Sequence, residues 1–271
     1  MNGNCLTSRQ FNGHMISLAG LGLGNLGEPY DIQLQPDAKP YSLFTPRHIP
    51  LPLRPQVKAE LDRIEAEGGI SQVDIPTPWC AGMVVAPKKN GSIHICVDFK
   101  PLNAYIIREV HPLPTVDENL AQLSGAKMFS KLDANSGFWQ IPLSENSKLL
   151  TTFVTPYGRC YFHKFPFGIC SAPEHFQKRM SRILQGLPGV LCQMDDVLVY
   201  GKDKDEHDVR VLLRIQEAGV TLNKEKCEFG KLELLFLGHR HGVQADPAKT
   251  SAIQKMHVFM HQQMSQNCDV F

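Results

Sequence analysis

The chain has 271 residues, of which 28 are basic and 27 acidic, for a formal net charge of +1. This length allows one large domain or two small ones, and the balanced charge neither announces nor excludes nucleic acid as a partner. The eight cysteines show no paired short spacing, and there is no signal-peptide pattern and no apolar run long enough to span a bilayer. We therefore expect reduced thiols in a soluble protein that stays inside the cell, in the cytoplasm, the nucleus or both.

The N-terminal region lacks a strong fold signal. Residues 1–27 are Gly-rich, and we expect them to form a poorly ordered leader. Residues 22–27 match G-x-G-x-x-G by letter, but no strand precedes them and no helix opens within them, so a dinucleotide fold is not favoured. Residues 28–55 predict an extended, Pro-rich arm that lies on the surface of another part of the protein, and the alternation in residues 30–34 predicts a short strand within it.

The next region predicts a helix and a hairpin. Apolar residues recur at helical spacing over residues 55–67, and a glycine pair follows. Residues 81–86 and 93–99 are apolar runs that flank a turn containing Lys88 and Lys89. Two lysines at a hairpin tip are suited to gripping phosphate groups, although lysine is also common in turns that are merely solvated.

The rest of the chain alternates helices and strands. Two capping boxes mark helix starts, Thr115 with Glu118 and Ser171 with Glu174. The further elements that we predict are, in order, a strand over residues 126–132, a hairpin over 151–165 that turns at 156–159, a helix over 172–185, a hairpin over 191–200, a helix over 205–218 and short strands at 220–222 and 234–237.

Two adjacent acids, Asp195 and Asp196, interrupt the apolar runs of residues 191–200. We predict that they form a two-residue turn between two strands. Neighbouring carboxylates repel each other unless a cation neutralises them, and hard oxygen ligands suit Mg²⁺ or Mn²⁺. An Asp-Asp pair is also common in ordinary solvated turns, so the pair by itself does not decide between a metal site and an idle turn.

The order of the elements adds a third acid. Strand, helix, strand, strand, helix, strand is the β-α-β-β-α-β order of an α+β, ferredoxin-like antiparallel sheet with both helices on one face. In that topology the first strand pairs beside the central hairpin, so Asp133 at its end meets Asp195 and Asp196. Three carboxylates can hold two divalent ions, which is the apparatus for in-line phosphoryl transfer from a triphosphate to a 3′-hydroxyl.

Seven motifs in family order also resemble the reverse transcriptase of gypsy-type LTR retroelements, over about residues 28–255. They lie at residues 87–92, 96–99, 129–133, 166–168, 193–196, 226–229 and 236–239. The resemblance implies a right-hand polymerase fold within residues 56–255, which makes DNA from deoxynucleoside triphosphates on an RNA or DNA template with a DNA primer. The fingers would be about 56–125 and 144–170, and the palm about 126–143 and 171–240.

The resemblance stops near residue 256. We therefore expect an unrelated tail over residues 256–271 and a truncated thumb. The RNase H and integrase domains of a full-length relative would be absent, so the chain would be a fragment of a longer polyprotein.

The resemblance also assigns roles to individual residues. Asp133, Asp195 and Asp196 would be the catalytic ligands of two Mg²⁺ or Mn²⁺ ions, and Lys226 would be the acid that protonates pyrophosphate. Phe138 would lie beneath the sugar, where its bulk rejects a 2′-hydroxyl. The full set of implied nucleotide-binding positions is Lys88, Lys89, His94, Ala134, Phe138, Phe167, Gly168 and Met194. The implied primer grip is Phe236, Leu237, Gly238 and His239.

Three features depart from the family pattern. His94 stands where arginine is usual, Gln193 stands where an aromatic residue is more common, and the segment around residues 209–213 is about three residues shorter. A neutral imidazole cannot make the bidentate phosphate contact of a guanidinium group, so we expect weaker nucleotide binding than in a typical relative.

Other functions fit parts of the same pattern. A two-metal nuclease would use the same carboxylates, and a catalytically weak or inactive remnant would only bind nucleic acid. Zinc ligands could come from Cys160, His163, Cys170 and His175, but their spacing matches no compact zinc motif.

Overall fold

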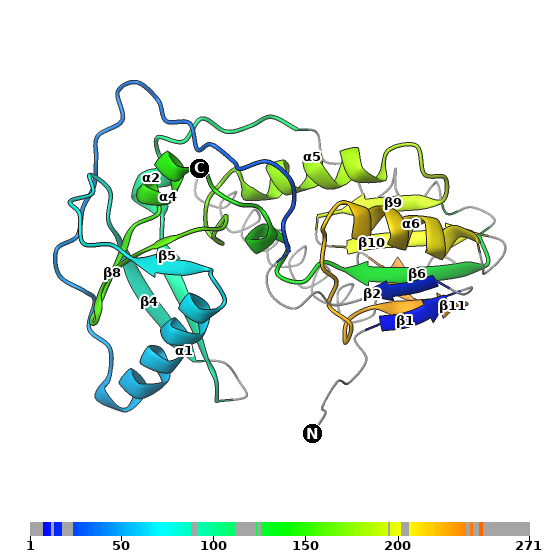
Figure 1. Ribbon diagram of the computed structural model, residues 1–271, viewed down its shortest axis with the longest axis horizontal. Helices are drawn as coiled ribbons and strands as arrows, with labels where there is room; N and C mark the ends of the chain where they lie inside the picture. Colours follow the sequence, from blue (N-terminus) through cyan, green and yellow to red (C-terminus); the bar gives the residue numbers. More distant parts are fainter. Residues whose placement is uncertain are drawn as a thin grey trace, which may run out of the picture.

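Figure 1 shows a computed structural model of the chain as two lobes side by side, each built on a β-sheet. The structure describes residues 8–11, 14–17, 24–87, 91–111, 123, 126–194, 196–201, 206–236, 239–240 and 244–245. The turn at Lys88 and Lys89, the helix predicted from Thr115 and the tail of residues 256–271 lie outside these residues.

The first lobe contains a five-stranded sheet in the order β3-β8-β7-β4-β5. All neighbouring strands are antiparallel except β4 and β7. Helix α1, Arg54–Ala66, packs against this sheet through the buried Val57, Leu61 and Ile64, which confirms the predicted helix. The strands, which confirm both hairpins predicted in this region, are β3 Ile70–Gln72, β4 Ala81–Pro87, β5 Ile93–Asp98, β7 Phe153–Thr155 and β8 Gly158–Phe162. The short helices are η1 Leu51–Leu53, α2 Lys100–Asn103 and α4 Glu145–Leu150.

The second lobe contains a four-stranded antiparallel sheet in the order β11-β6-β10-β9. Numbered along the chain within this sheet, that order is 4-1-3-2, which is the ferredoxin-like arrangement that the sequence predicts. Helices α5, Ala172–Leu184, and α6, Glu206–Glu217, pack on β9, on β10 and on each other, and so cover one face (Figure 1). The strands are β6 Met128–Asp133, β9 Val190–Gln193, β10 Asp196–Gly201 and β11 Glu228–Lys231.

The fourth strand of this sheet does not lie where we predicted it. Residues 220–222 contribute only an isolated bridge between Ala134 and Leu222. Val220 and Leu222 are apolar because they are buried in the core, not because they belong to a sheet. The edge position next to β6 is filled by β11, a short and partly polar strand with an irregular register, Glu228 opposite Lys131 and Lys231 opposite Phe129. An edge strand buries little apolar area, so its sequence carries a weak signal.

The remaining strands are short. Strands β12, Leu235–Phe236, β13, His239–Arg240, and β14, Gln244–Ala245, form a three-stranded sheet, so the predicted strand at 234–237 is confirmed in part. Within the N-terminal 27 residues, β1, Ser8–Phe11, pairs with β2, His14–Ser17, and β2 lies against α6. In the part of the chain that is described, no helix is both long and apolar enough to cross a membrane.

The arm that follows makes bridges instead of the strand predicted at residues 30–34. Tyr30 bridges to Leu143, and Leu34 bridges to Ile106. The ring of Tyr30 stacks on Phe165 at a centroid distance of 4.7 Å, and its hydroxyl donates to Ser171 Oγ over 3.2 Å. Ser171 makes no side-chain capping bond at the start of α5, so the predicted capping box is wrong there. The serine serves instead to fasten the arm.

Candidate active site

The two described acids of the predicted metal site face each other at the edge of the second lobe's sheet. β6 ends at Asp133, β10 begins at Asp196, and these two residues are direct register partners. Side chains opposite each other on antiparallel strands share a face, with Cβ atoms about 4.5–5.5 Å apart. The side chains of Asp133 and Asp196 are 13% and 27% exposed. The meeting of Asp133 with the central hairpin is therefore confirmed, while Asp195 lies outside the described residues.

Each of these carboxylates is paired with a lysine. Lys226 Nζ lies 3.4 Å from Asp133 Oδ1, and Lys131 Nζ lies 3.2 Å from Asp196 Oδ2. Lys226 was expected in the site, whereas Lys131 was not assigned a role. Its position two residues before Asp133 could have predicted that it lies beside the acids, since residues i and i+2 of a strand share a face.

The donor set fits a divalent cation. Two like charges held side by side require positive charge nearby, and partly exposed carboxylate oxygens are the ligands that Mg²⁺ and Mn²⁺ prefer. Two ammonium groups supply that charge in this structure. Among the described residues, which do not include Asp195, no three His, Cys, Asp or Glu side chains gather closely enough to hold a metal ion. A complete site would therefore need Asp195.

The turn between β9 and β10 is shifted by one residue from the prediction. Gln193 pairs with Asp196, so Asp196 belongs to the strand and not to the turn, which begins at Met194. Met194 has a φ of 53°, in the left-handed region that residues other than glycine seldom adopt. This geometry is held by Gln177, a buried residue of α5 that our sequence analysis did not single out. Its Oε1 accepts from Met194 N over 2.6 Å, and its Nε2 donates to Cys192 O over 2.9 Å.

The backbone of Asp133 is held from the opposite side of β6. Its N–H donates to Cys227 Sγ over 3.4 Å, and its carbonyl accepts from Asn223 N over 2.9 Å. Burial raises the pKa of the Cys227 thiol, and the negative charge of Asp133 raises it further. Cys227 therefore stays neutral near pH 7 and adds no negative charge beside the carboxylates.

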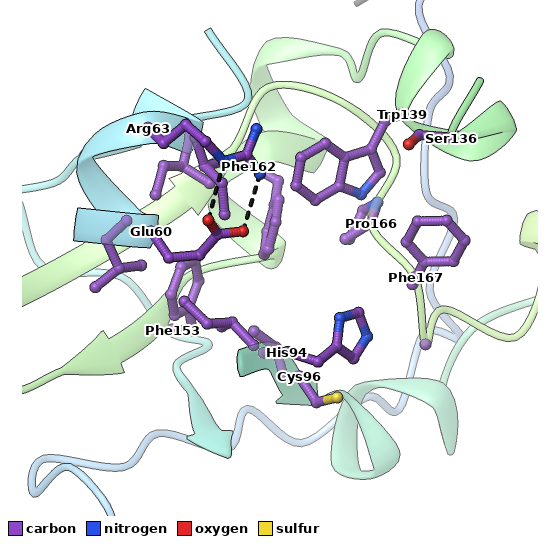
Figure 2. Close-up of a pocket in the computed structure, with 16 residues that line it drawn as sticks. Glu60, Arg63, His94, Cys96, Ser136, Trp139, Phe153, Phe162, Pro166 and Phe167 are labelled. Carbon is purple, nitrogen blue, oxygen red and sulfur yellow. Dashed lines mark hydrogen bonds and ion pairs between the residues drawn. The ribbon is translucent and has the colours of Figure 1, made fainter. Parts of the chain in front are cut away.

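A cavity of about 340 Å³ lies where α1, β5 and η2, Gly137–Gln140, approach one another. Figure 2 shows His94, Trp139 and Phe167 around this space, with Glu60 and Arg63 on another side. Glu60 and Arg63 form a two-bond ion pair with both distances at 2.9 Å.

The cavity brings together several of the predicted nucleotide-binding residues. His94, Phe167 and Gly168 line it, and the ring of Phe138 lies 5.2 Å from that of Phe167. The carbonyl of Gly168 is fixed by Asn103 Nδ2 over 2.7 Å. Asn103 was not predicted to take part in the site, because a lone asparagine carries no distinctive pattern.

Ala134, a predicted nucleotide-binding residue, and Phe236, a predicted primer-grip residue, are less accessible. The side chain of Ala134 is buried, and its backbone forms a bridge to Leu222. Phe236 is 3% exposed and packs in a second hydrophobic cluster with Phe129 and Leu198, so its ring is not available to a ligand. His239 pairs with Phe236 through the backbone. Lys88, Lys89, Leu237 and Gly238 lie outside the described residues.

The zinc alternative is not supported in the described part of the chain, where its four candidate residues form no metal cluster. His163 Nε2 lies 2.7 Å from Ser71 Oγ, and His175 Nδ1 lies 2.5 Å from Glu109 Oε2. Burial of Cys160 raises the pKa of its thiol to about 11. Each of these three side chains thus has a separate environment within the fold, and they do not converge on one site.

Comparison with known families identifies the domain. The family model described as reverse transcriptase (RNA-dependent DNA polymerase) matches residues 86–241. The chain belongs to the reverse transcriptase family. Its domain is of the kind found in retrotransposon and retroviral polyproteins, and we refer below to the first lobe as the fingers and to the second as the palm.

Curated relatives support this assignment. The chain is 34% identical over 220 residues to the "Retrovirus-related Pol polyprotein from transposon opus" of Drosophila melanogaster, a match that covers 76% of this chain and 22% of that protein. It is 34% identical over 200 residues to the "Transposon Tf2-3 polyprotein" of Schizosaccharomyces pombe, covering 71% and 15%. It is also 34% identical over 218 residues to "Uncharacterized protein K02A2.6" of Caenorhabditis elegans, covering 78% and 17%. The chain thus spans about a fifth of the length of these relatives.

Solved structures share the fold. The prototype foamy virus protease-reverse transcriptase superposes with a TM-score of 0.69 at 21% identity, over 80% of this chain and 29% of that one. The foamy viral enzyme in complex with an RNA/DNA hybrid gives 0.68 at 19% identity, over 80% and 30%. The likeness extends over most of the chain and confirms the polymerase fold that the sequence predicts.

Proposed function

We propose that the chain is the RNA-directed DNA polymerase segment of a gypsy-type LTR retrotransposon polyprotein. It would add deoxynucleotides to the 3′-hydroxyl of a DNA primer on an RNA or DNA template. The observation that carries the proposal is the register pairing of Asp133 with Asp196, which brings two carboxylates together at the sheet edge of a reverse transcriptase palm. The retrotransposon names of two similar polyproteins and the seven family-like motifs support the gypsy-type assignment.

The acids of the palm have a direct role in this proposal. Asp133 and Asp196, together with Asp195, would hold two Mg²⁺ or Mn²⁺ ions, which when bound activate the primer hydroxyl and neutralise charge on the triphosphate. Lys226, whose Nζ lies 3.4 Å from Asp133 Oδ1, would donate a proton to the leaving pyrophosphate. Lys131 holds the Asp196 carboxylate in place through its 3.2 Å ion pair.

The incoming nucleotide would lie between the fingers and the palm. Phe138 would be stacked beneath the sugar, supported by its contact with Phe167. His94, Phe167 and Gly168 border the neighbouring cavity. The other positions that we propose for nucleotide contacts are the backbone of Ala134, the side chain of Met194 and the two lysines Lys88 and Lys89.

The primer end would be supported next to the palm by the segment of residues 236–239. Because the ring of Phe236 is buried, this support would come from the backbone of the β12–β13 pair. RNA/DNA hybrid and double-stranded DNA occur in the complexes of structurally similar foamy viral enzymes. We propose the same classes of nucleic acid as partners of this chain.

Primer extension tests the function. The purified chain should extend oligo(dT) on poly(A) with dTTP in the presence of Mg²⁺, and Asp133→Asn should abolish extension. A matched control is Asp62→Asn on α1, which removes an acid that pairs with Lys58 far from the site. Cleavage of the template without extension would favour the two-metal nuclease. Binding of the primer and template with neither reaction would favour the inactive remnant.

A further inference from the structure

Gln140, at the end of η2, is a fully buried polar side chain that makes three hydrogen bonds to backbone groups. Its Nε2 donates to Asn135 O over 2.8 Å and to Thr221 O over 2.9 Å. Its Oε1 accepts from Thr221 N over 2.8 Å. Both N–H donors and one carbonyl lone pair are thus used inside the protein, so the amide is matched to its surroundings.

These bonds join two segments that meet behind the catalytic acid. One is the turn after Asp133, in which Ser136 has a φ of 49°. The other is the segment that follows α6, which includes Thr221 and Leu222. The two are also linked by Asn135 N, which donates to Thr221 O over 3.0 Å, and by the bridge between Ala134 and Leu222. The side chain of Gln140 lies between the turn after Asp133 and the segment that follows α6.

The N-terminal arm closes this arrangement from outside. Leu26 N donates to Gln140 O over 2.6 Å. A Cβ atom at Gly24 would lie 2.3 Å from Gln140 Oε1 and 3.0 Å from Gly219 O, so only glycine fits there without displacing the amide. Gly24 belongs to the glycine-rich run that matches G-x-G-x-x-G by letter. Its glycine is explained by close approach to Gln140, not by a nucleotide.

We propose that Gln140 is a positioning residue for nucleotidyl transfer. Its amide fixes the turn that runs from Asp133, a metal ligand, to Phe138 beneath the sugar, so both groups keep one relative position during the reaction. A small displacement of catalytic groups can lower the rate about 100-fold. The inference rests on the proposed polymerase function, and it adds a residue that contacts neither substrate nor metal.

Three variants perturb the amide in different ways. Gln140→Met keeps the size but removes all three bonds. Gln140→Glu keeps the acceptor for Thr221 N and places an oxygen against two carbonyl oxygens. Gly24→Ala leaves Gln140 unchanged and pushes on its Oε1. The matched control is Thr151→Val in the fingers, since Thr151 is equally buried and bonds Lys148 O at 2.7 Å and Phe162 N at 3.0 Å.

We expect all three variants to lower kcat for dTTP incorporation, by about 100-fold for Gln140→Met, with little change in KM for the primer-template. Amide exchange at Thr221, followed by NMR, should be at least about tenfold faster in Gln140→Met, because the acceptor of that N–H is lost. Thr151→Val should lower the melting temperature and leave kcat unchanged when assayed well below it.

The outcomes separate this inference from the proposed function. An active wild type with an unchanged kcat in Gln140→Met, or a kcat loss matched by Thr151→Val, would overturn the positioning role. Unchanged exchange at Thr221 would show that the amide does not hold the segment, and would overturn it as well. A wild type that binds primer-template but extends nothing would instead contradict the polymerase function.

Discussion

The carboxylate pair of the palm should weaken the fold that carries it. Asp133 and Asp196 lie opposite each other on neighbouring strands and are both mostly buried. Asp196→Asn removes one negative charge and keeps the size and shape of the side chain. We therefore expect this variant to lose primer extension and to gain thermal stability in the absence of divalent ions.

The expected gain follows from the register pairing of the two acids. With the charges taken at the Cβ separation typical of paired residues, about 5 Å, the two carboxylates repel by about 3 kcal/mol at an effective dielectric constant of about 20. The substitution also removes the ion pair between Lys131 and Asp196, which contributes about 1 kcal/mol or less. Solvent screens part of the repulsion because the two side chains are 13% and 27% exposed. We therefore expect the free energy of unfolding of Asp196→Asn to exceed that of the wild type by about 1 kcal/mol. This gain would raise the melting temperature by roughly 2–4 °C.

Circular dichroism melts in EDTA, with extension assays on the same preparations, measure both effects. Mn²⁺ should raise the melting temperature of the wild type more than that of Asp196→Asn, because we propose that it binds the carboxylates of the folded chain. Asp62→Asn, which removes an exposed acid from α1, should leave both the melt and extension almost unchanged. A lower melting temperature for Asp196→Asn would mean that its ion pair outweighs the repulsion, and the reasoning would fail.

Three further changes test other parts of the site. Gln177→Leu leaves Met194 N without its buried acceptor and should lower the free energy of unfolding in urea by about 2 kcal/mol, together with extension; an unchanged urea midpoint would contradict this. His94→Arg should lower KM for dTTP several-fold, and steady-state kinetics with an unchanged KM would count against a phosphate-facing role. Burial lowers the pKa of His175 below its unfolded value of 6.5, so its contribution to stability is complete above pH 6.5 and is lost as the pH falls from there. When the pH is lowered from about 7.5 to about 5.5, the free energy of unfolding should therefore fall less for His175→Gln than for the wild type. An equal fall would show that protonation of His175 does not cause this pH dependence.

The fold was predictable where apolar periodicity and chain order agree. The stripe of Val57, Leu61 and Ile64 marks α1, and the alternation of helices and strands gives the order of the palm sheet. The fourth palm strand was misplaced because residues 220–222 are the more apolar candidates. Hydrophobicity reports burial, and burial in a core loop looks the same in sequence as burial in a strand.

The meeting of Asp133 with Asp196 was predictable, but the residues that support the two acids were not. Asp133 stands at a strand end and Asp196 beside a hairpin turn, and the topology then brings the two together. Gln140 and Gln177 act through contacts to backbone groups far away in the chain. Every residue has a backbone N–H or C=O group, so a side chain that bonds to the backbone does not require a particular residue type at the partner position. A single sequence therefore gives no sign of such a contact.

The two buried glutamines suggest why this site can carry repelling charges at all. Each of the two turns beside these acids contains a residue in the left-handed region, Ser136 after Asp133 and Met194 before Asp196. Such conformations cost energy and persist only where the surroundings enforce them. A glutamine amide enforces them without adding charge, whereas a lysine or a carboxylate in the same place would change the electric field at Asp133 and Asp196. The palm thus separates two tasks: neutral amides set the geometry of the turns, and the charged side chains remain available for the metal ions and phosphates that we propose as ligands.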